Sequence, residues 1–174
     1  MDTSLSQRIE ANGKEYERLL KDENYTNVRF NLKNGALTAI HKDHNFDYKK
    51  GVYEIHVQNV GYNYGNAVIL GSETGKTIGE RYTDGLWNEK SFEIAATETG
   101  TSNNIKKGLN HCASKPDVKV AILYFPNDNF NMTIFENALA RYSGIGKTGG
   151  KGYVNFEEVI CISKDKILCK KKAT

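Results

Sequence analysis

A short run of apolar residues, Val118–Phe125, limits what this chain can fold into more than any other stretch of its sequence. A buried strand reads as a short apolar run, whereas a membrane span needs ~18 or more such residues. Just upstream, Thr101 or the next residue can cap a segment in which Ile105, Leu109 and Ala113 share one helical face. The sequence therefore predicts a helix packed on a sheet in which 118–125 is a central strand.

The rest of the chain mixes helical and extended patterns. Helices are predicted over about 4–21, 52–64 and from 131 or 133 to 142, and strands over 28–32, 36–40, 66–70, 81–83, 91–96, 153–163 and 167–169. Turns at Asn34-Gly35 and Asp84-Gly85 indicate two hairpins. This order predicts an α+β fold, with N-terminal helices followed by a mainly antiparallel four- to five-stranded sheet with packed helices. We expect a helical extension over 1–24 and a second domain over 25–174.

Composition and charge narrow the class of protein. The chain has 174 residues and a net charge of +3, which divides into −3 for residues 1–100 and +6 for residues 101–174. A basic half is a mild indication of phosphate-bearing partners, whereas charge alone favours a solubilising lysine surface. The start has no apolar core that would mark a signal peptide, and we expect no membrane association. The three cysteines are odd in number and widely spaced, which predicts neither disulfide nor zinc site.

Two glycine-rich segments invite comparison with phosphate loops. The segment Gly71–Thr77 has three residues between its glycines where a phosphate loop needs four, which favours a simple turn. The run from Tyr142 to Gly152 is predicted to be a glycine-lysine loop, in which Lys147 and Lys151 are candidates for binding phosphates. A plain connector is the alternative.

The densest set of chemically active residues is Ile40–Asp47, where His41 and His44 lie beside Lys42 and two aspartates. Two histidines three residues apart can ligate a metal if a third ligand comes from elsewhere. They can also supply the base and the acid of RNA cleavage near neutral pH, with a lysine to stabilise the phosphorane charge. A purely structural role for these histidines is equally compatible with the sequence.

A second candidate site combines Asp84 in a turn with Glu93 in a strand. Two carboxylates placed in this way can bind magnesium in restriction-type nucleases, which also need a lysine two residues after the glutamate. That position is Ala95, so the pattern is incomplete. A strand glutamate facing solvent is the structural alternative.

Several of these strings together resemble a known toxin-nuclease pattern. They are Asn34–His44, Gly51–Glu54, Asp84-Gly-Leu, Phe92-Glu93-Ile94, Thr101–Ile105 and Val118–Leu123. Residues 28–169 are similar, as a pattern of elements, to the barnase–colicin–EndoU-like ribonuclease superfamily. This superfamily includes toxin domains of contact-dependent inhibition proteins and of phage head-morphogenesis proteins. The resemblance implies a nuclease-like domain over 25–174.

The resemblance also implies metal-independent cleavage of RNA, often tRNA, by a bacterial toxin or phage-associated hydrolase. His41 and His44 match the upstream histidines as base and acid, Glu93 matches the strand acid, and Thr101 matches the polar residue that opens the helix. Lys42 or Lys107 would supply the cation that Ala95 lacks. The expected RNA-binding residues are Lys42, Trp87, Asn104, Lys106, Lys107, Lys147 and Lys151, with Trp87 stacking on a base.

We expect an RNA substrate, no cofactor, no bound metal and a cognate immunity or inhibitor protein as partner. The expected site of action is the cytoplasm, whether the protein is phage-encoded or delivered as a secreted effector. Two alternatives stay open: a non-catalytic module that binds nucleic acid or protein, and a metal-dependent nuclease that uses Asp84 and Glu93.

Overall fold

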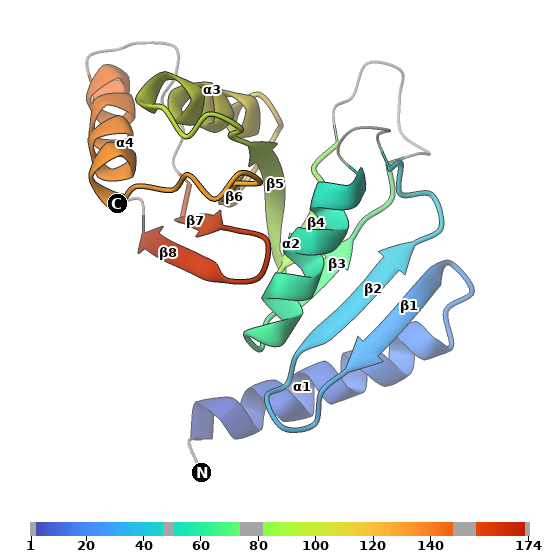
Figure 1. Ribbon diagram of the computed structural model, residues 1–174. Helices are drawn as coiled ribbons and strands as arrows, with labels where there is room; N and C mark the ends of the chain where they lie inside the picture. Colours follow the sequence, from blue (N-terminus) through green and yellow to red (C-terminus); the bar gives the residue numbers. More distant parts are fainter. Residues whose placement is uncertain (1–2, 47–50, 74–81, 148–155, 173–174) are drawn as a thin grey trace. The chain divides into compact units, whose positions relative to one another are not determined.

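The structure, a computed structural model, describes residues 3–46, 51–73, 82–147 and 156–172 (Figure 1). The chain divides into two compact units, one of residues 1–80 and 84–90 and the other of residues 81–83 and 91–174. Four helices and eight strands are described, and a helix precedes the first strand. The predicted α+β class is therefore confirmed, whereas the domain boundary after residue 24 stays a prediction.

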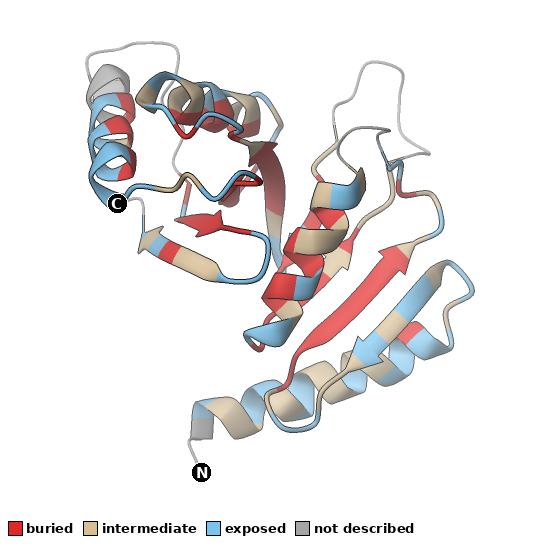
Figure 2. Ribbon diagram, in the orientation of Figure 1, coloured by how far each residue is buried: buried red, intermediate tan, exposed pale blue. Residues whose placement is uncertain are grey.

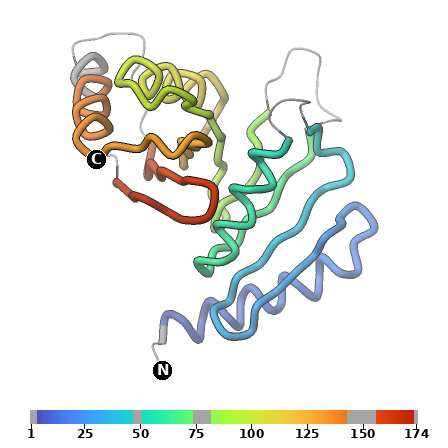
Figure 3. Tube along the Cα trace, viewed as in Figure 1, coloured from blue at the N-terminus to red at the C-terminus, as the bar shows by residue number. Residues whose placement is uncertain are grey.

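The first unit contains two helices and four strands. They are α1 (Thr3–Leu20), β1 (Tyr25–Phe30), β2 (Leu37–His41), α2 (Gly51–Asn63), β3 (Ala67–Leu70) and β4 (Gly85–Trp87). The strands follow the order β1-β2-β3-β4, with β1–β2 and β3–β4 antiparallel and β2–β3 parallel. A parallel pair needs a crossover, and α2 provides it. Figure 3 traces this path from α1 through the β1–β2 hairpin into α2.

Apolar contacts hold α1 against these strands, and hydrogen bonds hold α2 against them. Leu19 of α1 is 1% exposed and packs with Leu37, Ala39 and Ala67. Figure 2 shows β2 buried along its length as far as His41. The buried Gln58 of α2 donates from Nε2 to carbonyl oxygens of both β2 and β3, at 3.1 and 3.0 Å. These two hydrogen bonds fix the position of α2 over the parallel pair.

The second unit contains the other two helices and four strands. They are β5 (Lys90–Ala96), α3 (Ser102–Ala113), β6 (Val120–Tyr124), α4 (Met132–Lys147), β7 (Glu158–Ile162) and β8 (Ile167–Lys172). Strands β5, β6 and β7 are parallel neighbours, and β8 is antiparallel to β7. Helix α3 connects β5 to β6 and α4 connects β6 to β7. No described helix is long and apolar enough to cross a membrane.

The predicted packing of α3 on the apolar strand is confirmed. Ile105 and Leu109, 1% and 0% exposed, belong to the same buried cluster as Leu123 of β6. Gly108 lies on this face, and a Cβ atom there would be 2.9 Å from the Leu123 side chain. Thr101 caps the helix by accepting a hydrogen bond from the backbone N–H of Asn104 at 3.2 Å. Cys112, Cys161 and Cys169 are all buried, and none of them forms a disulfide bond.

The strand predicted over 81–83 is not formed at Tyr82 and Thr83, and residue 81 lies outside the described residues. Two predicted boundaries are also wrong. The turn expected at Asp84-Gly85 lies instead at Asn88 and Glu89, which both have positive φ, so Gly85 belongs to strand β4. The helix expected to end at Tyr142 continues to Lys147. Tyr142 is 4% exposed and its ring stacks on Phe156, with centroids 6.5 Å apart. This packing stabilises the end of the helix although glycine disfavours helix by ~1 kcal/mol per residue.

Candidate functional site

Four elements of the first unit end or begin at one edge of its sheet. Strands β2 and β3 are parallel, so their carboxyl ends share this edge, and α2 begins beside it. Asp84, directly before β4, is tied to the end of β3 because Gly71 N–H donates to its carbonyl at 3.0 Å. In sheets with parallel strands, ligands commonly bind beyond the carboxyl ends. The edge carries His44, Glu54, Glu73 and Asp84, which we call the acid–histidine cluster.

His44 is held in one orientation by two hydrogen bonds. A tight turn after β2 places it, with its backbone N–H donating to the His41 carbonyl at 2.9 Å. Its side chain is 0% exposed, and Nδ1 lies 2.8 Å from the carbonyl oxygen of Gly71 while Nε2 lies 3.2 Å from Glu54 Oε2. A carbonyl can only accept, so Nδ1 carries a proton and Nε2 faces the carboxyl group.

Glu54 is a buried carboxyl group on the first turns of α2, 4% exposed. Burial raises the pKa of Glu54 to about 7; the hydrogen bond to His44 lowers this pKa, and the neighbouring Asp84 raises it, but both effects are smaller than that of burial. Burial lowers the pKa of His44, but its hydrogen bonds to Glu54 and Gly71 outweigh this and leave that pKa raised. Glu54 and His44 therefore bind protons as a coupled pair.

Glu73 completes the cluster from the segment after β3. Its Oε1 lies 4.0 Å from His44 Nδ1, and its Oε2 accepts from the backbone N–H of Asn45 at 3.0 Å. Its own N–H donates to the carbonyl of Asp43 at 3.3 Å. Ligand atoms of His44, Glu54 and Glu73 all lie within 4.8 Å of one another. This spacing suits a divalent cation, and Asp84 lies beside the group in contact with Glu54.

The two predicted histidines have different neighbours, and their roles as base and acid stay a prediction. The His41 ring accepts at Nδ1 from the backbone N–H of Asp43 at 3.0 Å and stands edge-on to Tyr25, with centroids 5.0 Å apart. His44 faces Glu54 instead. Lys42 between them is exposed and its backbone N–H donates to Asn24.

The predicted residues of the second unit form another arrangement. Glu93 of β5 is 2% exposed, with Oε2 3.4 Å from Lys115 Nζ and 3.5 Å from His111 Nε2. Lys115 also donates to the carbonyl of Tyr82 at 2.9 Å. Lys115, which follows α3, is therefore a cation beside Glu93, whereas the cationic role of Lys42 or Lys107 stays a prediction.

The predicted RNA-binding residues are dispersed. Lys107 of α3 is exposed, Lys106 is half-buried, and Asn104 of the same helix donates from Nδ2 to Thr99 Oγ1. Trp87 is only 2% exposed, so the structure leaves no open ring face for a base at this position. Lys147 ends α4, and Lys151 lies outside the described residues.

Sequence reasoning found His44 and Asp84 but missed Glu54 and Glu73 as their neighbours. Glu54 lies ten residues beyond His44, and only the packing of α2 on the parallel pair brings it back. Glu54 is a single acid among the apolar residues of a helix, and a buried face rarely carries a charge without a partner. This pattern could have indicated that Glu54 is paired with another polar group.

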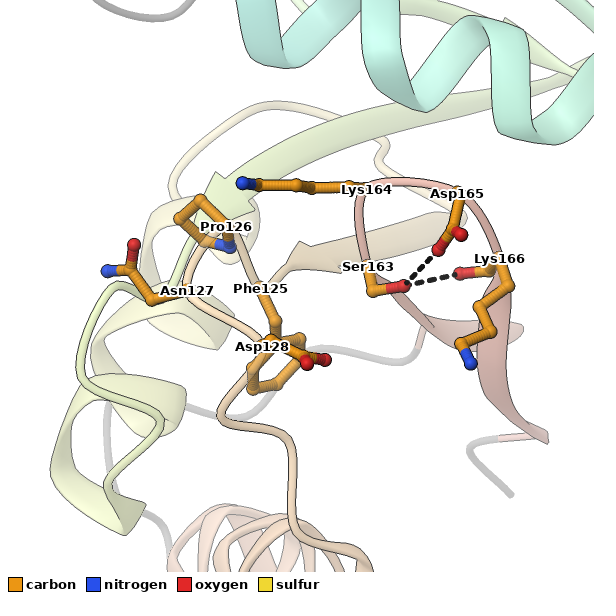
Figure 4. A pocket seen from close by; sticks show the side chains of 8 residues that line it. All are labelled: Phe125, Pro126, Asn127, Asp128, Ser163, Lys164, Asp165 and Lys166. Carbon is orange, nitrogen blue, oxygen red and sulfur yellow. Dashed lines mark hydrogen bonds between the residues drawn. The ribbon is translucent and has the colours of Figure 1, made fainter.

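A cavity of about 460 Å³ lies in the second unit where β6 and β7 end (Figure 4). Its wall includes Asp128 after β6 and the turn Ser163–Lys166. Ser163 Oγ lies 3.4 Å from Asp165 Oδ1 and 3.5 Å from the Lys166 carbonyl oxygen. Two lysines and two aspartates line the cavity, so it lacks the excess positive charge that attracts phosphate groups.

Comparison with known proteins finds a solved structure of similar fold. No protein-family model matches the chain, and no curated protein matches it either. A solved structure described as the CdiA-CT/CdiI toxin and immunity complex from Burkholderia pseudomallei contains a chain of similar fold. This chain shares its fold with a component of a toxin–immunity complex. The two are 18% identical, the match covers 71% of this chain and 85% of that one, and the TM-score is 0.50.

Proposed function

We propose that this chain is a toxin nuclease that cleaves RNA at the acid–histidine cluster with the help of a divalent cation. The observation that carries the proposal is the buried meeting of His44, Glu54 and Asp84 at the edge where parallel strands end. The fold shared with a toxin–immunity complex supports the toxin class.

The orientation of His44 supports a cation more than it supports a free acid–base residue. Metal-binding histidines usually donate their second ring N–H to a carbonyl or carboxylate, which fixes the tautomer. His44 Nδ1 meets this condition at the Gly71 carbonyl, and its Nε2 lone pair points to Glu54. A bound cation would lower the repulsion between Glu54 and Asp84 and displace the proton between Glu54 and His44.

The chemistry is hydrolysis of a phosphodiester bond. His44, Glu54 and Glu73 would hold the cation beside Asp84, and its chemistry there would be to polarise a phosphate oxygen and to activate a water molecule. The water oxygen attacks phosphorus and loses its proton, the bond from phosphorus to the 3′ oxygen breaks, and that oxygen gains a proton. The products are a 3′-hydroxyl and a 5′-phosphate.

Metal-free cleavage is the second candidate, and the pKa of Glu54 near neutrality favours it. In that mechanism the 2′-hydroxyl attacks phosphorus, the bond to the 5′ oxygen breaks, and a 2′,3′-cyclic phosphate and a 5′-hydroxyl result. His41 and His44 would act as base and acid, with Glu93 and Thr101 as positioning residues. The two candidates differ in their products and in their need for a cation.

Incubation with total RNA and with purified tRNA tests both candidates. The reaction is run in EDTA and after addition of Mg²⁺ or Mn²⁺, and the cleavage ends are mapped. We expect cleavage only with a cation, 5′-phosphate ends, and losses of about 10²-fold or more for Asp84→Asn and Glu54→Gln. His41→Ala serves as the matched control and should stay active, since its ring lies outside the cluster.

Other results would select the second candidate or neither. Cleavage in EDTA with cyclic phosphate ends, lost in His41→Ala, would favour the metal-free mechanism. Intact RNA under every condition, with a folded protein, would refute the nuclease proposal. Growth arrest on expression in bacterial cytoplasm, relieved by a co-expressed immunity protein, would separately test the toxin class.

A further inference from the structure

A pocket of about 580 Å³ opens in the first unit between β1–β2 and the start of α2. Small-molecule sites in proteins span ~300–1,000 Å³, so the pocket is large enough for one or two nucleosides. Its walls are mainly apolar and include exposed side chains, with Phe46 41% and Val52 59% exposed. The residues that line the pocket include Asn27, Ile40, Phe46, Val52, Ile55 and His56.

The pocket adjoins the acid–histidine cluster through a single ring. Phe46 stands edge-on to His44, with ring centroids 4.8 Å apart and planes at 74°. Gly51 at the start of α2 permits this position, because a Cβ atom there would come within 3.1 Å of Phe46 Cβ. A ligand in the pocket would therefore lie one aromatic ring from the groups proposed to bind the cation.

Helix α2 presents one face to the acid–histidine cluster and another face to the pocket. Glu54, Val57 and Gln58 are buried, whereas Val52, Ile55 and His56 are at least partly accessible and line the pocket. One helix therefore carries a carboxylate of the cluster and a wall of the pocket. Its register relative to β2, fixed by Gln58, sets both positions together.

Polar groups interrupt the apolar walls. Strand β1 is irregular between Thr26 and Arg29, and Asn27 has a φ of 50°. Such irregularities re-aim side chains, and here the exposed residue Asn27 borders the pocket, as His56 does. One amide and one imidazole can hydrogen-bond to the edge of a base, while the flat apolar walls accept its faces.

The guanidinium group of Arg29 lies further along the same face of α2. Arg29 stacks over the ring of Tyr62 at 4.5 Å from the centroid, and its Nη2 donates to Asn59 Oδ1 at 2.8 Å. Exposed aromatic rings followed by a guanidinium form the combination that holds single-stranded nucleic acids. A duplex cannot use such a pocket without unstacking, because its bases are already paired and stacked.

We infer that this pocket holds an unstacked base of a single-stranded RNA substrate, with the adjoining phosphate directed to the acid–histidine cluster. The inference rests on the proposed nuclease function, and it adds the substrate form and the residues that recognise it. Phe46 contributes the main stacking surface, Asn27 and His56 contact the base edge, and Arg29 contacts the backbone.

Binding is tested separately from cleavage. The full chain carrying Asp84→Asn is titrated into fluorescent single-stranded RNA, single-stranded DNA and duplex RNA, and anisotropy is recorded in EDTA. Phe46→Ala is added to this background, with Phe46→Tyr as the conservative variant. Leu32→Ala is the control, because Leu32 is 75% exposed in the turn between β1 and β2, outside the pocket.

We expect single-stranded RNA to bind more tightly than the duplex, and Phe46→Ala to weaken it about 5- to 150-fold, as loss of one stacked base does. Phe46→Tyr and Leu32→Ala should bind like the parent. In the cleavage-competent chain, Phe46→Ala should raise KM with a smaller change in kcat. Equal loss for single-stranded DNA would assign the site to single strands in general and overturn the choice of RNA.

The failures of the two proposals are distinguishable. Cleavage by the parent chain with an unchanged KM in Phe46→Ala would overturn the pocket and leave the nuclease intact. Unchanged RNA affinity in Phe46→Ala would overturn it too, and would point to an immunity protein as the occupant. Phe46-dependent binding without any cleavage would refute the nuclease function and support the pocket as a binding site.

Discussion

The raised pKa of Glu54 makes the stability of this protein depend on pH. The ordinary pKa of a glutamate is 4.5, and burial in the folded protein raises the pKa of Glu54 to about 7. Folding therefore favours the protonated carboxyl. Its stabilising contribution is fully present below pH 4.5 and is lost as the pH rises through 7. His44, whose pKa is also raised, changes stability with the same sign.

The size of the effect follows from the shift. At 1.36 kcal/mol for each pKa unit, a rise from 4.5 to about 7 corresponds to roughly 3 kcal/mol of unfolding free energy. Glu54→Gln keeps the shape of the side chain and a polar group facing His44 but cannot ionise. We therefore expect the native chain to lose up to about 3 kcal/mol more than Glu54→Gln between pH 4.5 and pH 8.

Urea unfolding at several pH values, followed by circular dichroism, measures this difference. Titrating groups that do not contact Glu54 cancel in the comparison, whereas His44, whose pKa Glu54 raises, adds to the difference with the same sign. Mn²⁺ should restore stability to the native chain at pH 8, by about 2.7 kcal/mol at one hundred times its Kd, and not to Glu54→Gln. Parallel pH profiles for the two chains would show that Glu54 has an ordinary pKa and would refute the reasoning.

Three further outcomes are expected from packing. Gly61→Ala should lower the unfolding free energy by about 1–3 kcal/mol, because a Cβ atom there would lie 2.6–2.8 Å from Val68 and Trp87. The matched variant Gly13→Ala, whose Cβ would lie an ordinary 3.5 Å from its nearest neighbour, should not destabilise, and equal urea midpoints would contradict the contrast. Leu109→Ala should cost about 2–5 kcal/mol, since Leu109 is fully buried, and an unmoved melting temperature would exclude this placement of α3. The three buried thiols should react with Ellman's reagent only after unfolding, because burial raises the pKa of Cys161, and rapid labelling of the native chain would contradict this.

Local patterns were enough to predict most of the elements. The helices at α1, α2 and α3 and the central strand β6 follow from periodicity and capping residues, because these depend on neighbours within a few positions. The turn after β4 could not be placed from Asp84-Gly85 alone. Asn88 is held there by hydrogen bonds to Asn66 and Ala67, 22 and 21 residues away.

In the candidate site, too, the sequence identified some residues and the tertiary structure determined which groups they contact. The sequence by itself identified His44 and Asp84 as polar residues next to strands, since both stand in short segments rich in charged and polar groups. Only the tertiary structure decided their partners. The crossover of α2 between parallel strands brings Glu54 to His44, and the end of α3 brings Lys115 to Glu93 across 22 residues. A charge can be buried only beside a compensating group, and that group is chosen by packing rather than by spacing along the chain.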